Sequence, residues 1–450
     1  MMRQALVVFV AFGLMSASAA AGELSFPKPQ VEQWQLENGM RVFYLGVHRT
    51  PVVTVQVWYH AGSKDEPRDR RGSAHMFEHL MFKGTQHVPP EEHARLLDKL
   101  GGSVNAFTME DTTGYHDTVP RQYMDFAMQL EAERMQHLVF LDKTIATERE
   151  VVKEEIRQRE NNPISKAFVR FREMAFVRHP YAWDPGGRIA DLDNTTPEDL
   201  ERFYRTYYQP NNAALVVVGD VSRAEVEKSA VQWFGSIPKA PEPPRPADAL
   251  PEPEQTEQRK EIVEAGQLGV IIGGYKMPPA KHDDLPALEV TAAVLSRGDS
   301  SRLHQRIVRK EKVGVFAGVF LEAMEHPGLM LVFGAHLLPE QAAKVEAAIL
   351  DEMTKLQKSK VGPRELTRVK NQLAAEFVYK LQNVTGLAWQ IGQSWILTGD
   401  PAAWLDDYDR LMAVSAEDVQ RVASTYLKPG RLTLVAVPPG GKAGGAGGGQ

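Results

Sequence analysis

Residues 197–218 read PEDLERFYRTYYQPNNAALVVV, and residues 416–437 read AEDVQRVASTYLKPGRLTLVAV. The two stretches align without a gap at a constant offset of 219 residues, with nine identical positions. Each predicts a helix, a turn at its proline and then a buried strand. Nine identities are more than chance similarity between two helix–strand units explains well. The repeat therefore indicates a duplicated chain with two homologous halves.

The first half also contains the motif His75-Met76-Phe77-Glu78-His79. Positions i and i+4 of a helix share one face, so the two histidines would project side by side. Two imidazoles at this spacing can hold one zinc ion, and Glu78 can activate a water molecule beside it. The pattern H-x-x-E-H is the inverse of H-E-x-x-H and occurs in zinc peptidases. A catalytic zinc ion needs a third protein ligand.

The third ligand is expected on a predicted helix that contains Glu148 and Glu155. These two glutamates are seven residues apart and share one stripe of the helix with Val151 and Val152. The apolar residues predict that this stripe is buried, whereas Glu154 points about 100° away from Glu155. The interpretation assigns Glu155 as the third zinc ligand and Glu148 as a second catalytic acid that does not touch the metal.

With these motifs the chain resembles the pitrilysin and mitochondrial-processing-peptidase family of inverted-motif zinc peptidases (inverzincins). In that family the glutamate ligand follows the motif at the distance seen here, where 75 residues separate His79 and Glu155. The resemblance runs from about Trp34 to Val437 and includes GSAHMFEHLMFKGT at residues 72–85. It implies an α+β fold with two homologous domains, each an antiparallel β-sheet packed with α-helices.

The resemblance implies a zinc-dependent endopeptidase, with one zinc ion per chain, that hydrolyses peptides or unfolded segments. Zinc would polarise the scissile carbonyl and lower the pKa of a water molecule. Glu78 would take the proton of that water and pass it to the leaving amine. The alternatives are a non-catalytic scaffold and a peptide-binding subunit of a related complex. Intact His75, Glu78, His79 and Glu155 argue against the scaffold.

Substrate contacts are also implied by the resemblance. Residues 104–115 predict a polar strand, and in the family such a strand is the edge to which an extended substrate adds. Asn105, Ala106 and Phe107 are the corresponding substrate-binding residues. The alternative is an ordinary turn and edge strand.

A second chain is expected to complete the active site. The family builds a chamber from four homologous domains, and this chain supplies two. In the second half, Arg309 matches the first member of an Arg/Tyr pair that holds the substrate carbonyl, but Phe316 replaces the tyrosine and has no hydroxyl to donate. The expected partner is therefore a different family chain that supplies the Arg/Tyr pair, giving a heterodimer, and otherwise a second copy in a homodimer.

Composition limits the remaining possibilities. The net charge of −6 argues against a nucleic-acid binder. The absence of cysteine excludes disulfides and cysteine-ligated zinc. His60, His87, His93, His137 and His179 lack ligand spacing, and surface or core roles are expected for them.

The N-terminus has the pattern of a signal peptide. Arg3 precedes an apolar segment at residues 5–15 and small residues at 16–21. The mature protein is expected to be exported and soluble in a periplasm, without a transmembrane anchor. The expected organisation is a signal peptide at 1–21, a catalytic zinc-binding domain at 22–235, a Pro-rich linker at 236–258, a homologous domain without the zinc motif at 259–439 and a disordered Gly-rich tail at 440–450.

Overall fold

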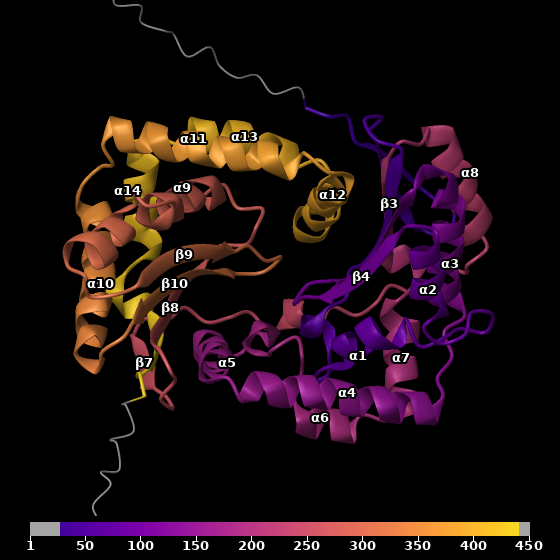
Figure 1. Ribbon diagram of the computed structural model, residues 1–450, viewed down its shortest axis with the longest axis horizontal. Helices are drawn as coiled ribbons and strands as arrows, with labels where there is room; N and C mark the ends of the chain where they lie inside the picture. The colour runs from indigo at the N-terminus through magenta and orange to yellow at the C-terminus, as the bar shows by residue number, and fades with distance from the viewer. Residues whose placement is uncertain (1–27, 441–450) are drawn as a thin grey trace, which may run out of the picture.

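The computed structural model describes residues 28–440, and its two β-sheets lie on opposite sides of the molecule (Figure 1). The first sheet contains the strands β1 (Glu32–Gln35), β2 (Arg41–Gly46), β3 (Val52–Tyr59), β4 (Ser103–Thr108), β5 (Thr113–Pro120) and β6 (Ala213–Gly219). The second contains β7 (Arg259–Ile262), β8 (Gly269–Met277), β9 (Phe316–Glu322), β10 (Gly328–His336) and β11 (Thr433–Val437). Their spatial orders are β1-β2-β6-β3-β5-β4 and β7-β11-β8-β10-β9. Neighbouring strands are antiparallel except for one parallel pair in each sheet, β2 with β6 and β7 with β11.

Within the described residues, α-helices pack against both sheets, so the expected α+β architecture is confirmed. The first half contains α1 (Ser73–Leu80), α2 (Glu92–Lys99), α3 (Met124–Gln136), α4 (Asp142–Glu160), α5 (Pro163–Ala175), α6 (Ile189–Asn194), α7 (Pro197–Tyr207) and α8 (Arg223–Phe234). The second contains α9 (Leu285–Ser296), α10 (Ala342–Lys358), α11 (Pro363–Lys380), α12 (Val384–Thr398), α13 (Trp404–Ala413) and α14 (Ala416–Tyr426). No helix in residues 28–440 has both the length and the apolar composition needed to span a membrane.

The sequence repeat folds into the same structure twice. Helices α7 and α14 both begin with a capping box, in which the hydroxyl of Thr196 or Ser415 accepts a hydrogen bond from the backbone N–H three residues later. A short turn follows each helix, and each copy then enters the strand of its sheet, β6 or β11, that also makes the parallel pairing. The offset of 219 residues is kept from the first cap to the turn.

Two helices cross from one half to the other. Helix α5 of the first half packs on the second sheet, where Phe171 belongs to an apolar cluster with Ile272. Helix α12 of the second half packs on β3 and β6, where Ile391 belongs to a cluster with Trp58 and Val216. In Figure 1 the orange α12 accordingly lies near the purple strand β3. Each sheet is therefore covered on one face by a helix from the other half.

Each crossing helix packs closely against the opposite half at a glycine. Gly392 lies inside α12, where glycine is less stable than alanine by about 0.5–1 kcal/mol. The indole of Trp58 packs so closely on it that a Cβ atom at this position would lie 2.2 Å from the ring. At the other contact, a Cβ atom on Gly274 of β8 would lie 2.7 Å from Cζ of Phe171. Neither contact leaves room for a side chain at the glycine position.

Residues 104–115, predicted as one strand, form a hairpin instead. Strands β4 and β5 are joined by a turn at residues 109–112. Asp111 in this turn is buried, and its carboxylate contacts Lys64 Nζ at 3.1 Å and accepts a hydrogen bond of 2.5 Å from the hydroxyl of Tyr181. The prediction was wrong because these partners are distant in sequence and leave no local signal for the turn.

The Pro-rich linker, residues 236–258, contacts both halves of the chain, and Gln255 donates a 3.1 Å hydrogen bond to the carbonyl of Leu432 in the second half. The carboxylate of Glu252 accepts hydrogen bonds of 2.9–3.1 Å from the backbone N–H groups of residues 177–179. The linker therefore has a fixed path on the surface. The predicted signal peptide and the predicted tail beyond Gly440 lie outside the described residues.

Candidate metal centre

Helix α1, which carries the H-x-x-E-H motif, is fixed near both ends. It begins after Gly72, whose φ of 94° is a left-handed conformation that favours glycine. The buried carboxylate of Glu66 accepts hydrogen bonds of 2.8 Å from the N–H groups of Gly72 and Ala74. Burial raises the pKa of Glu66 to about 8. Near the other end, the hydroxyl of Tyr115 donates a 2.8 Å hydrogen bond to the carbonyl of Phe77.

The motif residues lie on the face of α1 that is not buried in the core. The apolar side chains of the helix are buried in the first half: Met76, Phe77 and Leu80. His75, Glu78 and His79 are half-buried, and the two imidazole rings are 5.1 Å apart and nearly perpendicular. Within the described residues Glu78 makes no ion pair or hydrogen bond through its side chain.

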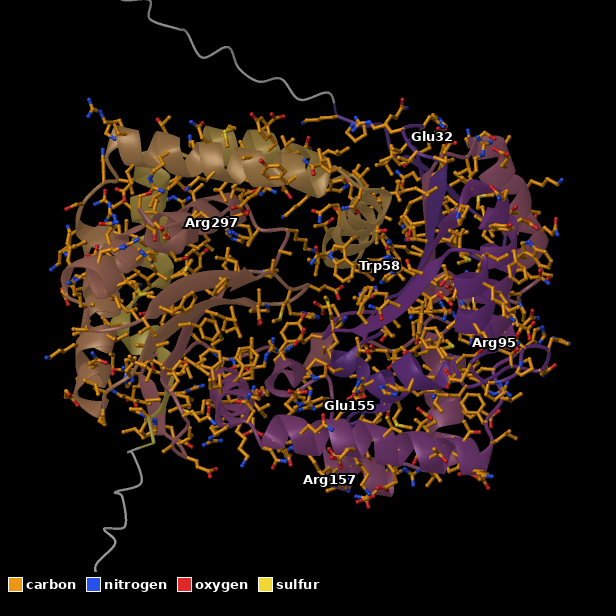
Figure 2. The ribbon with its side chains drawn as sticks, viewed as in Figure 1. Glu32, Trp58, Arg95, Glu155, Arg157 and Arg297 are labelled. Atoms are coloured by element: carbon orange, nitrogen blue, oxygen red, sulfur yellow. The ribbon has the colours of Figure 1, made fainter. Side chains whose placement is uncertain are left out.

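Helix α4 brings Glu155 to the two histidines. Its carboxylate oxygens lie 3.5 Å from Nε2 of His75 and 3.7 Å from Nε2 of His79. In Figure 2, Glu155 lies on the upper side of α4 and Arg157 on the lower side. Donor atoms around a tetrahedral zinc ion with bonds of about 2.0–2.1 Å are about 3.3 Å apart. The observed separations are close to that value, and all three donor atoms lie within 4.8 Å of one another.

The chemistry of these donors also fits a metal ion. Burial and the neighbouring ring of His79 lower the pKa of His75 to about 4, so its imidazole is neutral at neutral pH, as a metal ligand must be. In residues 28–440, the two histidines are the only basic groups within 4 Å of the Glu155 carboxylate. No lysine or arginine in this part of the chain takes the place of a cation at its oxygens.

Glu148 lies behind His79 and not beside the three donors. One of its oxygens is 3.5 Å from Nδ1 of His79, and the other is 3.2 Å from Nζ of Lys83. The Glu148 side chain is 6% exposed and that of Glu155 is 47% exposed. A carboxylate on the second ring nitrogen of a metal-binding histidine orients the ring and increases its basicity.

Comparison with known protein families shows which family the chain belongs to. A family model described as "Insulinase (Peptidase family M16)" matches residues 41–182, and one described as "Peptidase M16 inactive domain" matches residues 194–373. The chain belongs to peptidase family M16. The first match contains H-x-x-E-H together with Glu148 and Glu155 of α4, and the second covers much of the half that lacks the motif.

Individual M16 proteins support the assignment. The chain is 32% identical over 416 residues to "Zinc protease PqqE" of Helicobacter pylori, which covers 91% of this chain and 93% of that protein. A solved protease structure from Helicobacter pylori has a TM-score of 0.88 at 31% identity and covers 91% of this chain and 100% of that one. The structure of the periplasmic protease PqqL from Escherichia coli has a TM-score of 0.77 at 19% identity and covers 92% of this chain but 48% of that one.

The three expected substrate residues lie on β4, at the edge of the first sheet. Within the described residues β4 pairs with β5 alone, so its other edge forms no strand pairing. The side chain of Asn105 is exposed and its oxygen accepts a 2.9 Å hydrogen bond from the N–H of Ala106. The ring of Phe107 packs against Trp58 and Trp389, with centroids 4.8 and 4.3 Å away. The ring of Phe107 is therefore held between residues of both halves.

Arg309 lies in the second half, in a π-helical segment at His304–Lys310. Its side chain is 61% exposed, and its guanidinium lies 3.8 Å from the carboxylate of Asp299. Phe316, at the start of the edge strand β9, is 47% exposed. Among the described residues no contact joins either side chain to the histidine–glutamate cluster.

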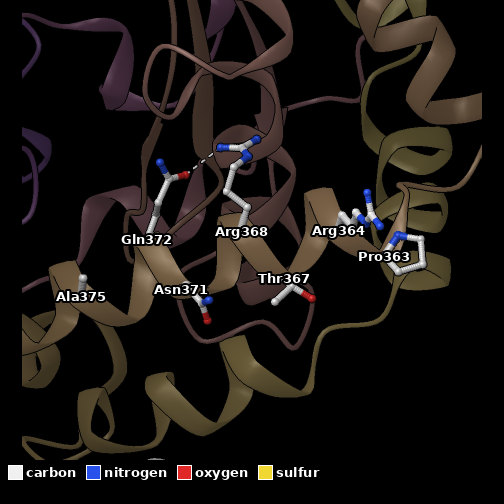
Figure 3. A pocket seen from close by; sticks show the side chains of 7 residues that line it. All are labelled: Pro363, Arg364, Thr367, Arg368, Asn371, Gln372 and Ala375. Carbon is white, nitrogen blue, oxygen red and sulfur yellow. Dashed lines mark hydrogen bonds between the residues drawn. The ribbon is translucent and has the colours of Figure 1, made fainter. Parts of the chain in front are cut away.

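A hollow on α11 is a less suitable site. Figure 3 shows its residues on one helix, with Arg368 donating a 2.9 Å hydrogen bond to Gln372. The face of one helix does not enclose a ligand as binding sites commonly do. The candidate functional site is therefore the one at α1 and α4.

Two site residues were missed by sequence reasoning, and one neighbour was placed wrongly. Lys83 follows His79 at the same four-residue spacing that joins the two histidines, and this spacing could have identified it. Glu66 is too far from α1 for any local capping pattern. Val151, predicted to share the buried stripe of α4, is 42% exposed. Only the Val152 side of that stripe faces the core.

Proposed function

We propose that this M16 chain is a zinc-dependent endopeptidase that hydrolyses peptides or unfolded segments. The observation that supports this most directly is the convergence of His75, His79 and Glu155 beside the unpaired Glu78. His75, His79 and Glu155 would hold one zinc ion per chain. A zinc ion held there would polarise a peptide carbonyl and lower the pKa of a water molecule.

The protein's own residues would move the protons. Glu78 is adjacent in sequence to His79 and has no cationic partner in the described part of the chain, so its carboxylate can accept the proton of the attacking water. The same carboxyl group then donates that proton to the nitrogen of the departing amine. Glu148 would hold the ring of His79 through Nδ1, and Lys83 would hold Glu148.

The first prediction tests the three ligands by metal content. We expect His75→Ala, His79→Ala and Glu155→Gln each to lower bound zinc, because each removes one of three donors. Glu154→Gln is the matched control on α4, since its side chain is 57% exposed and pairs with Arg157. Elemental analysis of the dialysed variants measures the effect. Full zinc in Glu155→Gln together with loss in Glu154→Gln would show that the wrong glutamate had been assigned.

We propose that peptides bind along the unpaired edge of β4. An extended segment added there would form main-chain hydrogen bonds with the backbone of Asn105, Ala106 and Phe107, independently of its side chains. This mode favours unfolded segments as substrates because a folded chain has few free backbone groups. The proposed substrate class rests on the zinc peptidase proposal.

We further propose that a second M16 chain completes the catalytic chamber. PqqL supports this because the present chain covers 48% of it, so that protein has room for two units of this size in one chain. The partner would supply an arginine and a tyrosine where this chain has Arg309 and Phe316. A heterodimer is favoured over a homodimer because two identical chains would both lack the tyrosine hydroxyl.

The second prediction concerns this partner. The purified chain is expected to hydrolyse peptides slowly, and addition of a partner with the Arg/Tyr pair should raise the rate by about 10²–10³-fold, the usual value of one transition-state hydrogen-bond donor. Solution mass and peptidase rate are measured with and without the partner. Phe316→Tyr should raise the rate of the isolated chain, whereas Phe320→Tyr, on the same strand and 50% exposed, should not. A fully active homodimer whose rate rises neither with the added partner nor with Phe316→Tyr would exclude the heterodimer.

We also propose export to a periplasm on the basis of the N-terminal sequence pattern. The segment concerned, residues 1–21, lies outside the described residues. N-terminal sequencing of the protein from its native cells would show whether it is removed.

A further inference from the structure

Two other groups of histidine and carboxylate side chains have donor atoms within 4.8 Å of one another in residues 28–440. The first, His93, Asp117 and Glu131, is buried around Arg134, whose guanidinium pairs with Glu131. A protein cation already compensates these carboxylates, and the group is closed to solvent. The second group, His87, Glu133 and His137, has no arginine or lysine within ion-pair distance in the described part of the chain.

The second group is held together by backbone contacts as well as by side chains. Helix α3 ends at Gln136, and the residues that follow it meet the loop after α1. The N–H of Gln86 donates to the carbonyl of His137 at 2.9 Å, and Thr85 forms an isolated antiparallel bridge with Leu138. The loop and the end of α3 therefore have a fixed spacing.

The side chains converge at this junction. Nδ1 of His87 lies 3.0 and 3.2 Å from the two oxygens of Glu133, and the hydroxyl of Thr85 donates a 2.6 Å hydrogen bond to the same carboxylate. His137 follows Glu133 by four residues, so both lie on one side of the end of α3. The rings of His87 and His137 are 5.2 Å apart and nearly perpendicular. The ring of His137 has no hydrogen-bond partner among the described residues.

We propose that His87, Glu133 and His137 form a second binding site for a divalent transition-metal ion, with zinc as the ion that best matches the donors. Two imidazoles and one carboxylate are ligands that zinc accepts in tetrahedral sites. The unpartnered ring of His137 supplies a donor that no protein group uses. His87 is 66% exposed, so the ion can enter directly and its fourth position remains open to water.

A metal ion at this site would stabilise the segment that follows helix α1. The loop that contains Thr85 and His87 begins just after Lys83, whose ammonium lies 3.2 Å from Glu148. An ion shared between this loop and α3 would resist their separation. Because a ligand that binds only the folded state raises stability by mass action, zinc beyond the first equivalent should raise the melting temperature.

The site is tested by counting metal ions on the full-length chain. Zinc-free protein is titrated with zinc chloride, and bound zinc is measured by equilibrium dialysis with elemental analysis. We expect two equivalents on the unmodified chain, one on His75→Ala/His79→Ala, one on His87→Ala/His137→Ala and none on the fourfold variant. Loss of both surface ligands should weaken the second zinc by at least about tenfold, since even groups outside the first coordination sphere are worth that much.

His48 provides the matched control. It is 63% exposed and lies 2.8 Å from a carboxylate oxygen of Asp220, but no second histidine is part of that pair. His48→Ala should leave both zinc equivalents and the zinc-dependent rise in melting temperature unchanged. A background variant without His75 and His79 that binds no zinc would overturn the second site, as would a second equivalent that survives His87→Ala/His137→Ala. Failure of the catalytic zinc proposal would appear separately, as zinc binding unaffected by His75→Ala/His79→Ala.

Discussion

Glu78→Gln is expected to keep its full zinc content and to lose about 10²–10⁴-fold in peptidase rate, the range attributed to one general acid–base group. The amide has nearly the same size as the carboxylate but cannot accept the proton of water. Zinc content should not change because Glu78 is not among the three converging donors, His75, His79 and Glu155. Elemental analysis and a fluorogenic peptide assay on the same preparation measure both quantities.

Two glutamates on α4 serve as comparisons for Glu78→Gln. Glu154→Gln should behave as the unmodified chain because Glu154 faces solvent beside Arg157. Glu148→Gln should retain most of the zinc and lose about 10–100-fold in activity, as groups that orient a metal ligand do. Loss of zinc in Glu78→Gln would indicate that Glu78 is a metal ligand. An unchanged peptidase rate would show that Glu78 does not transfer the proton.

Lys64→Met is expected to lower the free energy of unfolding by about 3–5 kcal/mol, the cost of leaving buried charges without their partner. Lys64 is 2% exposed, and its ammonium lies 3.1 Å from Asp111 and 3.0 Å from Glu325. Burial alone would lower the pKa of Lys64, but Asp111, Asp65 and Glu325 raise it above its ordinary value. Glu325 lies in the turn between β9 and β10, so this network joins the two halves. Chemical unfolding followed by tryptophan fluorescence measures the loss.

A surface lysine is the control for Lys64→Met. Lys260 pairs with Glu346 at 2.6 Å and is 44% exposed, and Lys260→Met should cost less than about 1 kcal/mol. The double change Lys64→Met/Glu325→Gln should cost less than the sum of its single changes, since the second change removes a charge that the first leaves unpaired. Equal stability of Lys64→Met and Lys260→Met would contradict a structural role for the buried network.

The residues of the proposed metal centre could be predicted from the sequence because helical spacing relates them within short segments. Helical spacing pairs His75 with His79, and the same periodicity separates Glu155 from Glu154. The repeated helix and strand likewise indicate two related halves from the sequence alone. The buried turn at Asp111, the pairing of Lys64 with Glu325 and the cluster of His87 with His137 could not be predicted in this way, because each depends on residues brought together by tertiary packing.

The crossing of α5 and α12 affects how the chain is made. The last strand of the first sheet, β6, ends at Gly219, but α12, which covers that sheet, ends 179 residues later at Thr398. At synthesis rates of about 5–20 residues per second, α12 is completed about 10–40 seconds after the last strand of this sheet. Trp58 and Val216, buried under α12 in the finished protein, are uncovered during that interval. Variants that weaken α12 should therefore aggregate during synthesis while their metal-binding residues remain intact.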